Sequence, residues 1–142
     1  LPDNFMYGSA HLLKCTFKSV EQIYKTAFVF CTKLHTFLAP RCRVVLNQAF
    51  MQCFQLSEVD MRSLEDIGDA AFSYTNVKRM ILKNLKSVGV EAFSGSALEQ
   101  IDVGDCEILQ SSCFEPGVEV VGSKQFVQFK MMPKIYYRDL SK

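Results

Sequence analysis

Apolar and polar residues along the chain follow a repeat with a period in the low twenties. Each unit is marked by a small residue followed by phenylalanine, and we call these phenylalanines landmark residues. They are 22, 22, 21 and 21 residues apart, and Phe5, 23 residues before the first of them, is interpreted as the remnant of an earlier landmark. A period of this length predicts a solenoid of stacked units. The marking pairs are Ala27-Phe28, Ala49-Phe50, Ala71-Phe72, Ala92-Phe93 and Cys113-Phe114.

The ten residues that end at each landmark align without gaps, and apolar or small residues hold their second, fifth, ninth and tenth places. They read SVEQIYKTAF, RCRVVLNQAF, SLEDIGDAAF, NLKSVGVEAF and DCEILQSSCF. A second apolar set follows the landmarks, in which Leu56, Val59 and Met61 match Val77, Met80 and Leu82, and then Leu98, Ile101 and Val103.

The second apolar set alternates with polar residues, which predicts one short β-strand per unit with one buried face. The remaining residues of a unit, about sixteen, are too few for a crossover through a long helix. We therefore predict parallel strands stacked roughly 4.8 Å apart, joined by irregular or short-helical returns. Residues 1–123 are predicted to form five to six units of this solenoid, and residues 124–142 to cap its end.

The block LEDIGDAAFSYTNVKRMIL resembles the BspA-like (Treponema pallidum-type) leucine-rich repeat, with Gly68 and Gly89 after an apolar residue and the Ala-Phe pair. The commonest leucine-rich repeat has Asn or Cys where this chain has Val20, Leu64 and Leu85, and here only Cys42 and Cys106 match that pattern. The resemblance covers about residues 5–123. It implies an α/β-type repeat solenoid, a right-handed coil with its strands on a concave face. It also implies a role in binding proteins, and a bacterial or parasite surface location.

Composition argues against two classes of protein, those that bind nucleic acid through a strong overall charge and those that span a membrane. Sixteen Lys and Arg balance fifteen Asp and Glu, so no global basic field attracts nucleic acid. No apolar run reaches the length of a membrane span. Hydrophobic residues make up 49% of the chain, which is ample for a continuous core. Residue 1 is Leu rather than Met, which we interpret as a fragment or a processed chain.

All six cysteines stand at places where the repeat puts core or small linker residues. Cys31 and Cys53 follow a landmark by three places, and Cys15 takes the place of Val59. We interpret the six as buried free thiols, with a disulfide framework as the alternative. Free thiols favour a reducing, cytoplasmic compartment, whereas the family resemblance favours the cell surface.

Two His-Cys pairs, His11-x3-Cys15 and Cys31-x3-His35, have spacings that suit a metal. The repeat register sends Cys15 inward and His35 outward, so we predict neither a metal site nor another cofactor. No Ser, Cys and His group with an orienting acid is evident, and no catalytic residue is predicted. Gly95 is interpreted as part of a tight linker, because no phosphate-binding motif surrounds it.

The residues that flank the buried position of each predicted strand point away from the core and form the candidate binding surface. Adjacent strands place Glu58 near Arg79 and Arg62 near Lys83. Leu38 and Ile81 are the apolar members of a surface that is otherwise polar. The candidate residues are Lys14, Thr16, Lys18, Thr36, Leu38, Glu58, Asp60, Arg62, Arg79, Ile81, Lys83, Gln100 and Asp102, with Pro40 and Gly104 at its edge.

Three functions are consistent with this pattern. The first is a non-enzymatic module that binds another protein, through the strand face. The second is a structural spacer, or a fragment of a longer surface or adhesion repeat protein. The third is a weak binder of nucleic acid or anionic lipid through the tail KQFVQFKMMPKIYYRDLSK, which mixes basic and aromatic residues.

Overall fold

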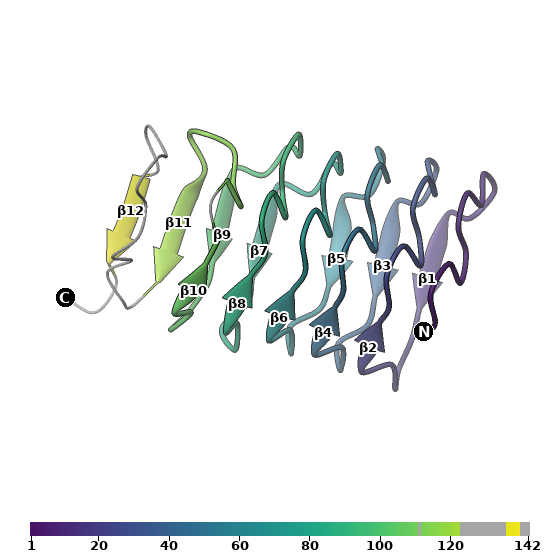
Figure 1. Cartoon of the computed structure of the whole chain (residues 1–142), viewed down its shortest axis with the longest axis horizontal. Helices are drawn as coiled ribbons and strands as arrows, with labels where there is room; N and C mark the ends of the chain where they lie inside the picture. Colours follow the sequence, from purple (N-terminus) through teal and green to yellow (C-terminus); the bar gives the residue numbers. More distant parts are fainter. Residues whose placement is uncertain (111, 123–135, 140–142) are drawn as a thin grey trace.

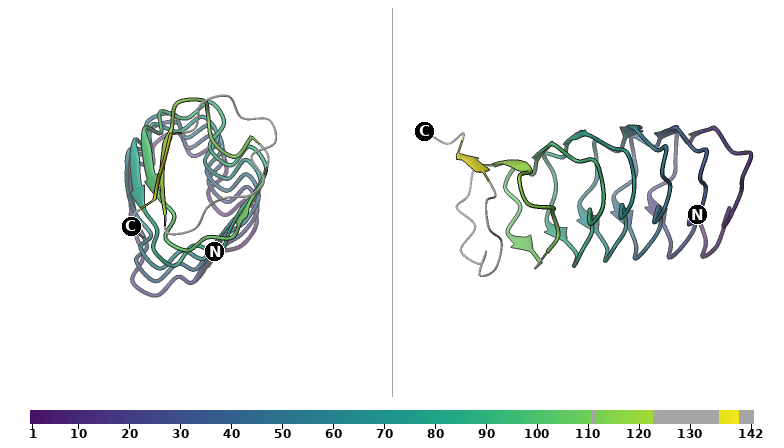
Figure 2. Two further views of the ribbon diagram at one scale, coloured as in Figure 1. Left: turned by 90° about the vertical axis from the view of Figure 1, so that its left-hand side faces the viewer. Right: turned by 90° about the horizontal axis from the view of Figure 1, so that it is seen from above.

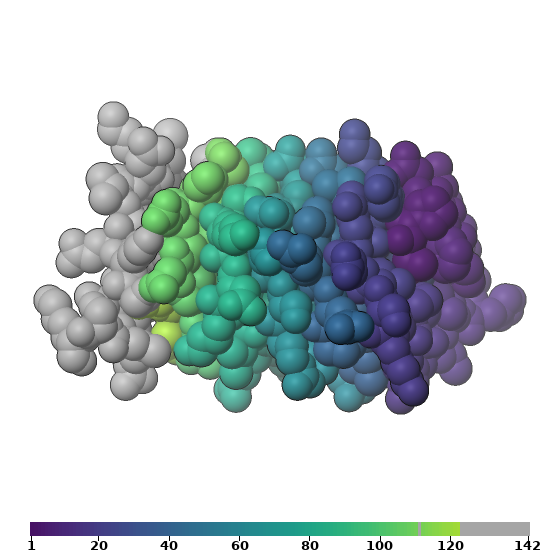
Figure 3. Space-filling model, turned by 90° about the horizontal axis from the view of Figure 1, so that it is seen from below, coloured from purple at the N-terminus to yellow at the C-terminus, as the bar shows by residue number. Residues whose placement is uncertain are grey.

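The structure is a computed structural model that describes residues 1–110, 112–122 and 136–139, the last of these as backbone. The chain winds into a stack of coils, and β1 and β12 lie at opposite ends of the stack (Figure 1). Viewed along the axis, successive coils superpose on one another (Figure 2). On the surface the colours follow one another along the axis, from purple at the N-terminal end to green (Figure 3).

Each of the first five complete coils contributes two strands, where the sequence predicted one. The long strands are β1 (Lys14–Thr16), β3 (Thr36–Leu38), β5 (Glu58–Asp60), β7 (Arg79–Ile81) and β9 (Gln100–Asp102), continued by β11 (Glu119–Gly122) and β12 (Tyr136–Asp139). The short strands are β2 (Gln22–Ile23), β4 (Val44–Val45), β6 (Asp66–Ile67), β8 (Ser87–Val88) and β10 (Ile108–Leu109).

The short strands were missed because two residues cannot display an alternation of apolar and polar positions. Their second residue is the apolar fifth place of the ten-residue block, and Ile23, Val45, Ile67 and Val88 are all buried there. The five short strands form one uninterrupted parallel sheet in the order β10-β8-β6-β4-β2.

The long strands also pair in parallel, in the register that the repeat predicted. Cys15 lies opposite Phe37, and Phe37 opposite Val59. After Phe114, where the repeat is least regular, Val120 of β11 lies opposite Ile101. In the described strands this ladder is divided into β1-β3-β5 and β12-β11-β9-β7.

The returns between the sheets are turns, and the described residues contain no helix. Two residues in each return adopt a left-handed backbone conformation, in which a residue other than glycine costs roughly 1–2 kcal/mol. The residue two positions before a landmark has a φ of 52° to 59°, and the residue two positions after it has a φ of 56° to 68°. With Met6 as the first landmark, for the reason given below, the first group is Asn4, Thr26, Gln48, Ala70, Glu91 and Ser112, and the second is Gly8, Phe30, Gln52, Tyr74 and Gly95.

The landmark phenylalanines stack face to face through the centre of the solenoid. Ring centroids are 5.3 Å apart for the Phe28–Phe50, Phe50–Phe72 and Phe72–Phe93 pairs, and 5.7 Å for Phe93–Phe114. Each such pair stabilises a core by about 0.5–1.5 kcal/mol beyond its buried area. This ladder explains why one aromatic residue recurs once per coil.

The assignment of Phe5 as an earlier landmark was wrong by one residue. The amide of Met6 donates to the carbonyl of Ala27 at 2.7 Å, as the amide of Phe28 donates to Ala49 at 2.8 Å. Met6 therefore holds the landmark place. Phe5 contacts Phe28 edge-on, with centroids 6.1 Å apart.

Gly68 and Gly89 are required by close approach of the preceding coil. A Cβ atom on Gly68 would lie 2.6 Å from the backbone nitrogen of Asn47, and one on Gly89 would lie 2.6 Å from that of Asp69. The side chains of Asn47 and Asp69 also accept hydrogen bonds from backbone amides of the next coil. The amide of Asp69 donates to Asn47 Oδ1 at 2.9 Å, and the amide of Val90 donates to Asp69 Oδ1 at 2.8 Å.

The predicted capping segment, residues 124–142, lies outside the described residues except for β12. The backbone of β12 pairs in parallel with β11, with Tyr136 opposite Glu119. This strand therefore extends the long-strand ladder by one further member.

Candidate interaction surface

The outward side chains of β1, β3, β5, β7 and β9, with Lys18, Arg62 and Lys83 just beyond them, form what we call the long-strand face. Register places them in rows along the solenoid axis. One row begins with Lys14 opposite Thr36, and the next with Thr16 opposite Leu38. The predicted site residues are thus brought together on one side of the molecule.

Exposure differs sharply among these residues. Ile81 is 68% exposed, and the charged residues Lys14, Lys18, Arg62, Arg79 and Lys83 are exposed as predicted. Leu38, Asp60, Gln100 and Asp102 are half-buried. Thr36 is the exception to the predicted exposure of this face, since it is only 7% exposed.

Thr36 is buried because a hydrogen-bonded chain of side chains covers it. Its hydroxyl donates to Glu58 Oε2 at 2.8 Å and lies 3.2 Å from Nδ1 of His35, whose Nε2 lies 3.1 Å from Ser57 Oγ. The Nδ1–H tautomer of His35 satisfies every donor and acceptor in this chain. The sequence pattern did not predict this group, although the 22-residue repeat places Ser57 beside His35 and Glu58 beside Thr36.

Two ion pairs lie on the long-strand face. Arg62 donates from Nε to Asp60 at 3.0 Å, a hydrogen bond that lowers the pKa of the Asp60 carboxyl. Lys83 Nζ lies 2.6 Å from Asp102 of the next coil. Among the described residues, the predicted neighbours Glu58 and Arg79 do not form an ion pair with each other.

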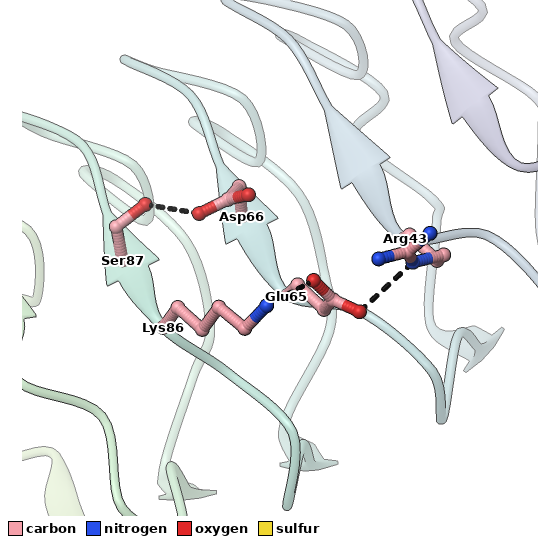
Figure 4. Close-up of polar contacts among 5 residues, drawn as sticks. All are labelled: Arg43, Glu65, Asp66, Lys86 and Ser87. Carbon is pink, nitrogen blue, oxygen red and sulfur yellow. Dashed lines mark hydrogen bonds and ion pairs between the residues drawn. The ribbon is translucent and has the colours of Figure 1, made fainter.

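A second set of charges lies beside the short strands and was also missed. Glu21, Arg43, Glu65, Lys86 and Glu107 hold one repeat position and alternate in sign; we call them the charge row. Arg43 Nε and Lys86 Nζ lie 2.8 and 2.6 Å from the two oxygens of Glu65 (Figure 4). Hydrogen bonds from Arg43 and then Lys86 lower the pKa of Glu65 to about 2.

One polar pair accompanies the charge row on the outer side of the short strands. Ser87 Oγ donates to Asp66 Oδ1 at 2.7 Å, in the adjacent coil (Figure 4). Side-chain bonds therefore join neighbouring coils on both sides of the solenoid.

The model of the BspA type leucine-rich repeat region matches six copies over residues 1–120. The chain belongs to this family. A crystal structure of a leucine-rich repeat protein from Bacteroides ovatus superposes with a TM-score of 0.71 at 25% sequence identity. The alignment covers 84% of this chain and 34% of that one, so the chain spans about a third of the length of the Bacteroides protein. No curated protein matches the chain.

Leucine-rich repeats of this type are generally non-enzymatic, and the family suggests protein partners in general terms. Within residues 1–110 and 112–122, no group of three or more His, Cys, Asp or Glu is placed to hold a metal ion. The part of the chain that the structure describes contains no helix long and apolar enough to cross a membrane.

The six cysteines of this leucine-rich repeat are buried free thiols, as the repeat register predicted. Burial raises the pKa of Cys15, Cys42 and Cys106 to about 11 and that of Cys113 to about 12. Cys31 and Cys53 donate from Sγ to carbonyl oxygens of the preceding coil, Met6 at 3.1 Å and Phe28 at 3.0 Å. These thiols therefore act as small core side chains that also bind backbone.

Proposed function

We propose that this leucine-rich repeat protein is a non-enzymatic module that binds another protein through its long-strand face. The observation that carries the proposal is Ile81, a large apolar side chain that is 68% exposed in the middle of the surface. Single exposed apolar residues are common on monomers. Ile81, however, has Arg79 beside it on the same strand face, and among the described residues Arg79 lacks an ion-pair partner.

Arginine is one of the residues enriched among those that dominate protein interfaces, and such residues gather near the centre of an interface, where they are well packed. The ion pairs Arg62–Asp60 and Lys83–Asp102 lie to either side and would serve as a polar rim. The phenylalanine ladder packs behind this face, where Phe37 of β3 contacts Phe28 and Phe50, and a surface backed by a packed core loses less entropy on binding than a mobile one.

The test is affinity capture from the source cells followed by mass spectrometry, with wild type and two matched double variants. Ile81→Asp with Arg79→Glu alters the long-strand face. Ile108→Asp with Arg41→Glu makes the same chemical changes at exposed positions on and beside the short strands. We expect the first variant to bind the captured partner at least about tenfold more weakly than wild type, which corresponds to a loss of about 1.4 kcal/mol. The second variant should retain the partner. Equal recovery by both variants would reject the long-strand face as the binding site.

A structural spacer is the second candidate, and the coverage of the Bacteroides protein favours it. Because this chain aligns with 34% of that protein, coils like these form only a part of that longer chain. A spacer predicts that neither double variant changes what is captured. Binding through the C-terminal tail concerns residues outside the described part of the chain, and it predicts a steep loss of affinity with salt.

A further inference from the structure

The first strand of the long-strand ladder, β1, is paired on one side only. Its single neighbour among the described strands is β3, and it lies at the N-terminal end of the stack (Figure 1). The amide of Thr36 donates to the carbonyl of Leu13 at 3.3 Å, and the amide of Phe17 donates to the carbonyl of Leu38 at 2.8 Å. The other side of β1 is an open edge of the sheet.

The backbone groups of Lys14 and Thr16 face this open side. Residues of a parallel strand bond alternately to its two sides, and Leu13 and Phe17 bond to β3, so Cys15 also faces β3 and the two residues between face away from it. Within the described part of the chain, the N–H and C=O groups of Lys14 and Thr16 have no partner. We call these groups the β1 edge. Donors and acceptors in this arrangement are a template for a further strand.

Two lysines on the β1 strand are available for an incoming strand. Lys14 and Lys18 are both exposed, whereas Thr36, the partner of Lys14 on β3, is only 7% exposed. Neither lysine forms an ion pair with another described residue. Carboxylates on an added strand could therefore pair with both, as Asp102 pairs with Lys83 of the preceding coil at 2.6 Å.

Apolar side chains beside the β1 edge favour protein over water as its neighbour. Leu13, at the start of the edge, is 61% exposed, in a row whose next two members are the polar residues His35 and Ser57. Cys15 is the smallest side chain at its place in the described ladder and is 8% exposed, and Phe17 is half-buried. Inward apolar residues of an added strand would cover Cys15 and Phe17 from the open side.

The two lysines argue against a second copy of this chain as the neighbour. Two β1 edges paired with each other would bring Lys14 and Lys18 of both copies into one interface, and like charges on adjacent strands repel. Lysine on an edge strand is a common protection against such self-association. A strand with carboxylates at its outward places has the complementary charge.

We propose that the β1 edge binds a β-strand of a partner protein whose outward residues are acidic and whose inward residues are apolar. Read along β1 from Lys14 to Lys18, the complementary strand is acidic, apolar, polar, apolar and acidic. Main-chain hydrogen bonds to the β1 edge supply affinity, and the two lysines select the acidic residues. This site lies at the end of the ladder, and it does not rest on the function proposed for the long-strand face around Ile81.

The test is fluorescence anisotropy with a labelled peptide of about nine residues that contains Glu-Ile-Thr-Ile-Glu, long enough to pair with all of β1. This motif reads the same in both directions, so the test does not depend on whether the added strand is parallel or antiparallel. The matched peptide has Lys in place of both Glu. It keeps the length, the apolar residues and the backbone, and it changes only the sign of the charge.

Two substitutions of Thr16 separate the backbone edge from the side chain. Thr16→Pro removes an N–H that β3 does not use, and proline is tolerated on edge strands where the N–H faces outward. It also favours the extended conformation that the preceding Cys15 already has. Thr16→Val is the matched control, because it keeps the N–H. A third variant, Lys14→Glu with Lys18→Glu, reverses the charge and leaves the backbone intact.

We expect wild type and Thr16→Val to bind the acidic peptide saturably, and Thr16→Pro to bind it at least about tenfold more weakly. The Lys14→Glu, Lys18→Glu variant should reverse the preference, binding the lysine peptide and losing the acidic one. Thermal unfolding of each variant is measured alongside. The charge reversal tests the proposal even where Thr16→Pro destabilises the fold.

Four results would each overturn the proposal. They are absence of binding by wild type, equal binding of the two peptides, undiminished binding by a folded Thr16→Pro variant, and no reversal of preference by the charge variant. Sedimentation of wild type as a dimer that Thr16→Pro dissociates would also overturn it, in favour of pairing between two copies of this chain.

Discussion

The two sides of the solenoid respond differently to the same change in unit length. Five residues separate Phe50 from Leu56, but only four separate Phe72 from Val77, and four again separate Phe93 from Leu98. The long-strand ladder is divided between β5 and β7, directly after this shortened linker. The short strands, in contrast, pair without interruption from β2 to β10.

The phenylalanine ladder, like the short-strand sheet, is not interrupted where the unit length changes. The stacking distance is 5.3 Å for both Phe50–Phe72 and Phe72–Phe93, although the first interval has 22 residues and the second 21. The landmarks and short strands therefore maintain the alignment of coils, and the linker before each long strand absorbs the variation. The long-strand side is consequently the side on which unit length can vary.

The largest effect is expected from Phe72→Ala, which removes the ring at the junction between longer and shorter coils. Phe72 is fully buried and stacks on a neighbour at each side, so the free energy of unfolding should fall by about 3–5 kcal/mol. Urea denaturation measures it. Phe114→Ala, at the end of the described ladder, is the matched control and should cost less. Equal losses would contradict the central role of the ladder.

A smaller loss is expected from Gly68→Ala, on the short-strand side. The added methyl group would meet backbone atoms of Asn47 and Leu46 at 2.6 and 2.7 Å, which flexible side chains cannot relieve. Overpacking of this kind costs about 1–3 kcal/mol, read from the denaturation midpoint. Gly8→Ala would meet nothing within 4 Å, so it separates the cost of a left-handed backbone, roughly 1–2 kcal/mol, from the cost of crowding. A neutral Gly68→Ala variant would show that adjacent coils can separate.

The charge row should make a modest contribution that depends on pH. Its partners Arg43 and Lys86 lower the pKa of Glu65 to about 2, against about 4.3 for an unfolded chain. The folded state thus favours the ionised carboxylate, so the stabilisation is complete above the unfolded pKa and is lost as pH falls towards 2. The melting temperature of wild type should exceed that of Glu65→Gln at pH 6, and the difference should vanish near pH 2.

High salt supplies the control for the Glu65 experiment. Exposed ion pairs are screened at 1 M salt, so the difference at pH 6 should shrink there. A difference between wild type and Glu65→Gln that is independent of both pH and salt would indicate packing rather than charge.

Inserting one serine after Thr75 should change stability least. It tests most directly whether linker length divides the long-strand ladder. Five linker residues would then precede β7 and four would still precede β9, so the division of the ladder should move by one coil. The amides of Glu99 and Gln100 now donate to Lys78 at 2.8 and 3.2 Å and should lose hydrogen-exchange protection. Unchanged protection would mean that linker length does not cause the division.

The sequence predicted the core and the register well because both repeat in every coil. The five stacked landmarks, the inward place of Cys15 and the pairing of Thr16 with Leu38 all follow from alignment of the units. The exposure of single side chains does not follow from it. Thr36 is buried only because His35, Ser57 and Glu58 happen to be able to hydrogen-bond around it.

Other features escaped because their signals are short or unrelated to hydrophobicity. A two-residue strand leaves no alternation to detect, which is why the second sheet was missed. The charge row was visible as a change of sign every 21 or 22 residues, but apolar residues alone were aligned. Phe5 was chosen as a landmark for its chemistry, whereas hydrogen bonding selects Met6.

The alternating signs of the charge row have a consequence for how such a chain can lengthen or shorten by recombination. Excising one coil would place Arg43 beside Lys86, or Glu21 beside Glu65, and like charges on adjacent strands destabilise a sheet. Excising two consecutive coils would leave every charge next to its opposite. We therefore expect the gain or loss of an even number of coils to be tolerated better than that of an odd number, because each coil contributes one side chain to the alternating charges.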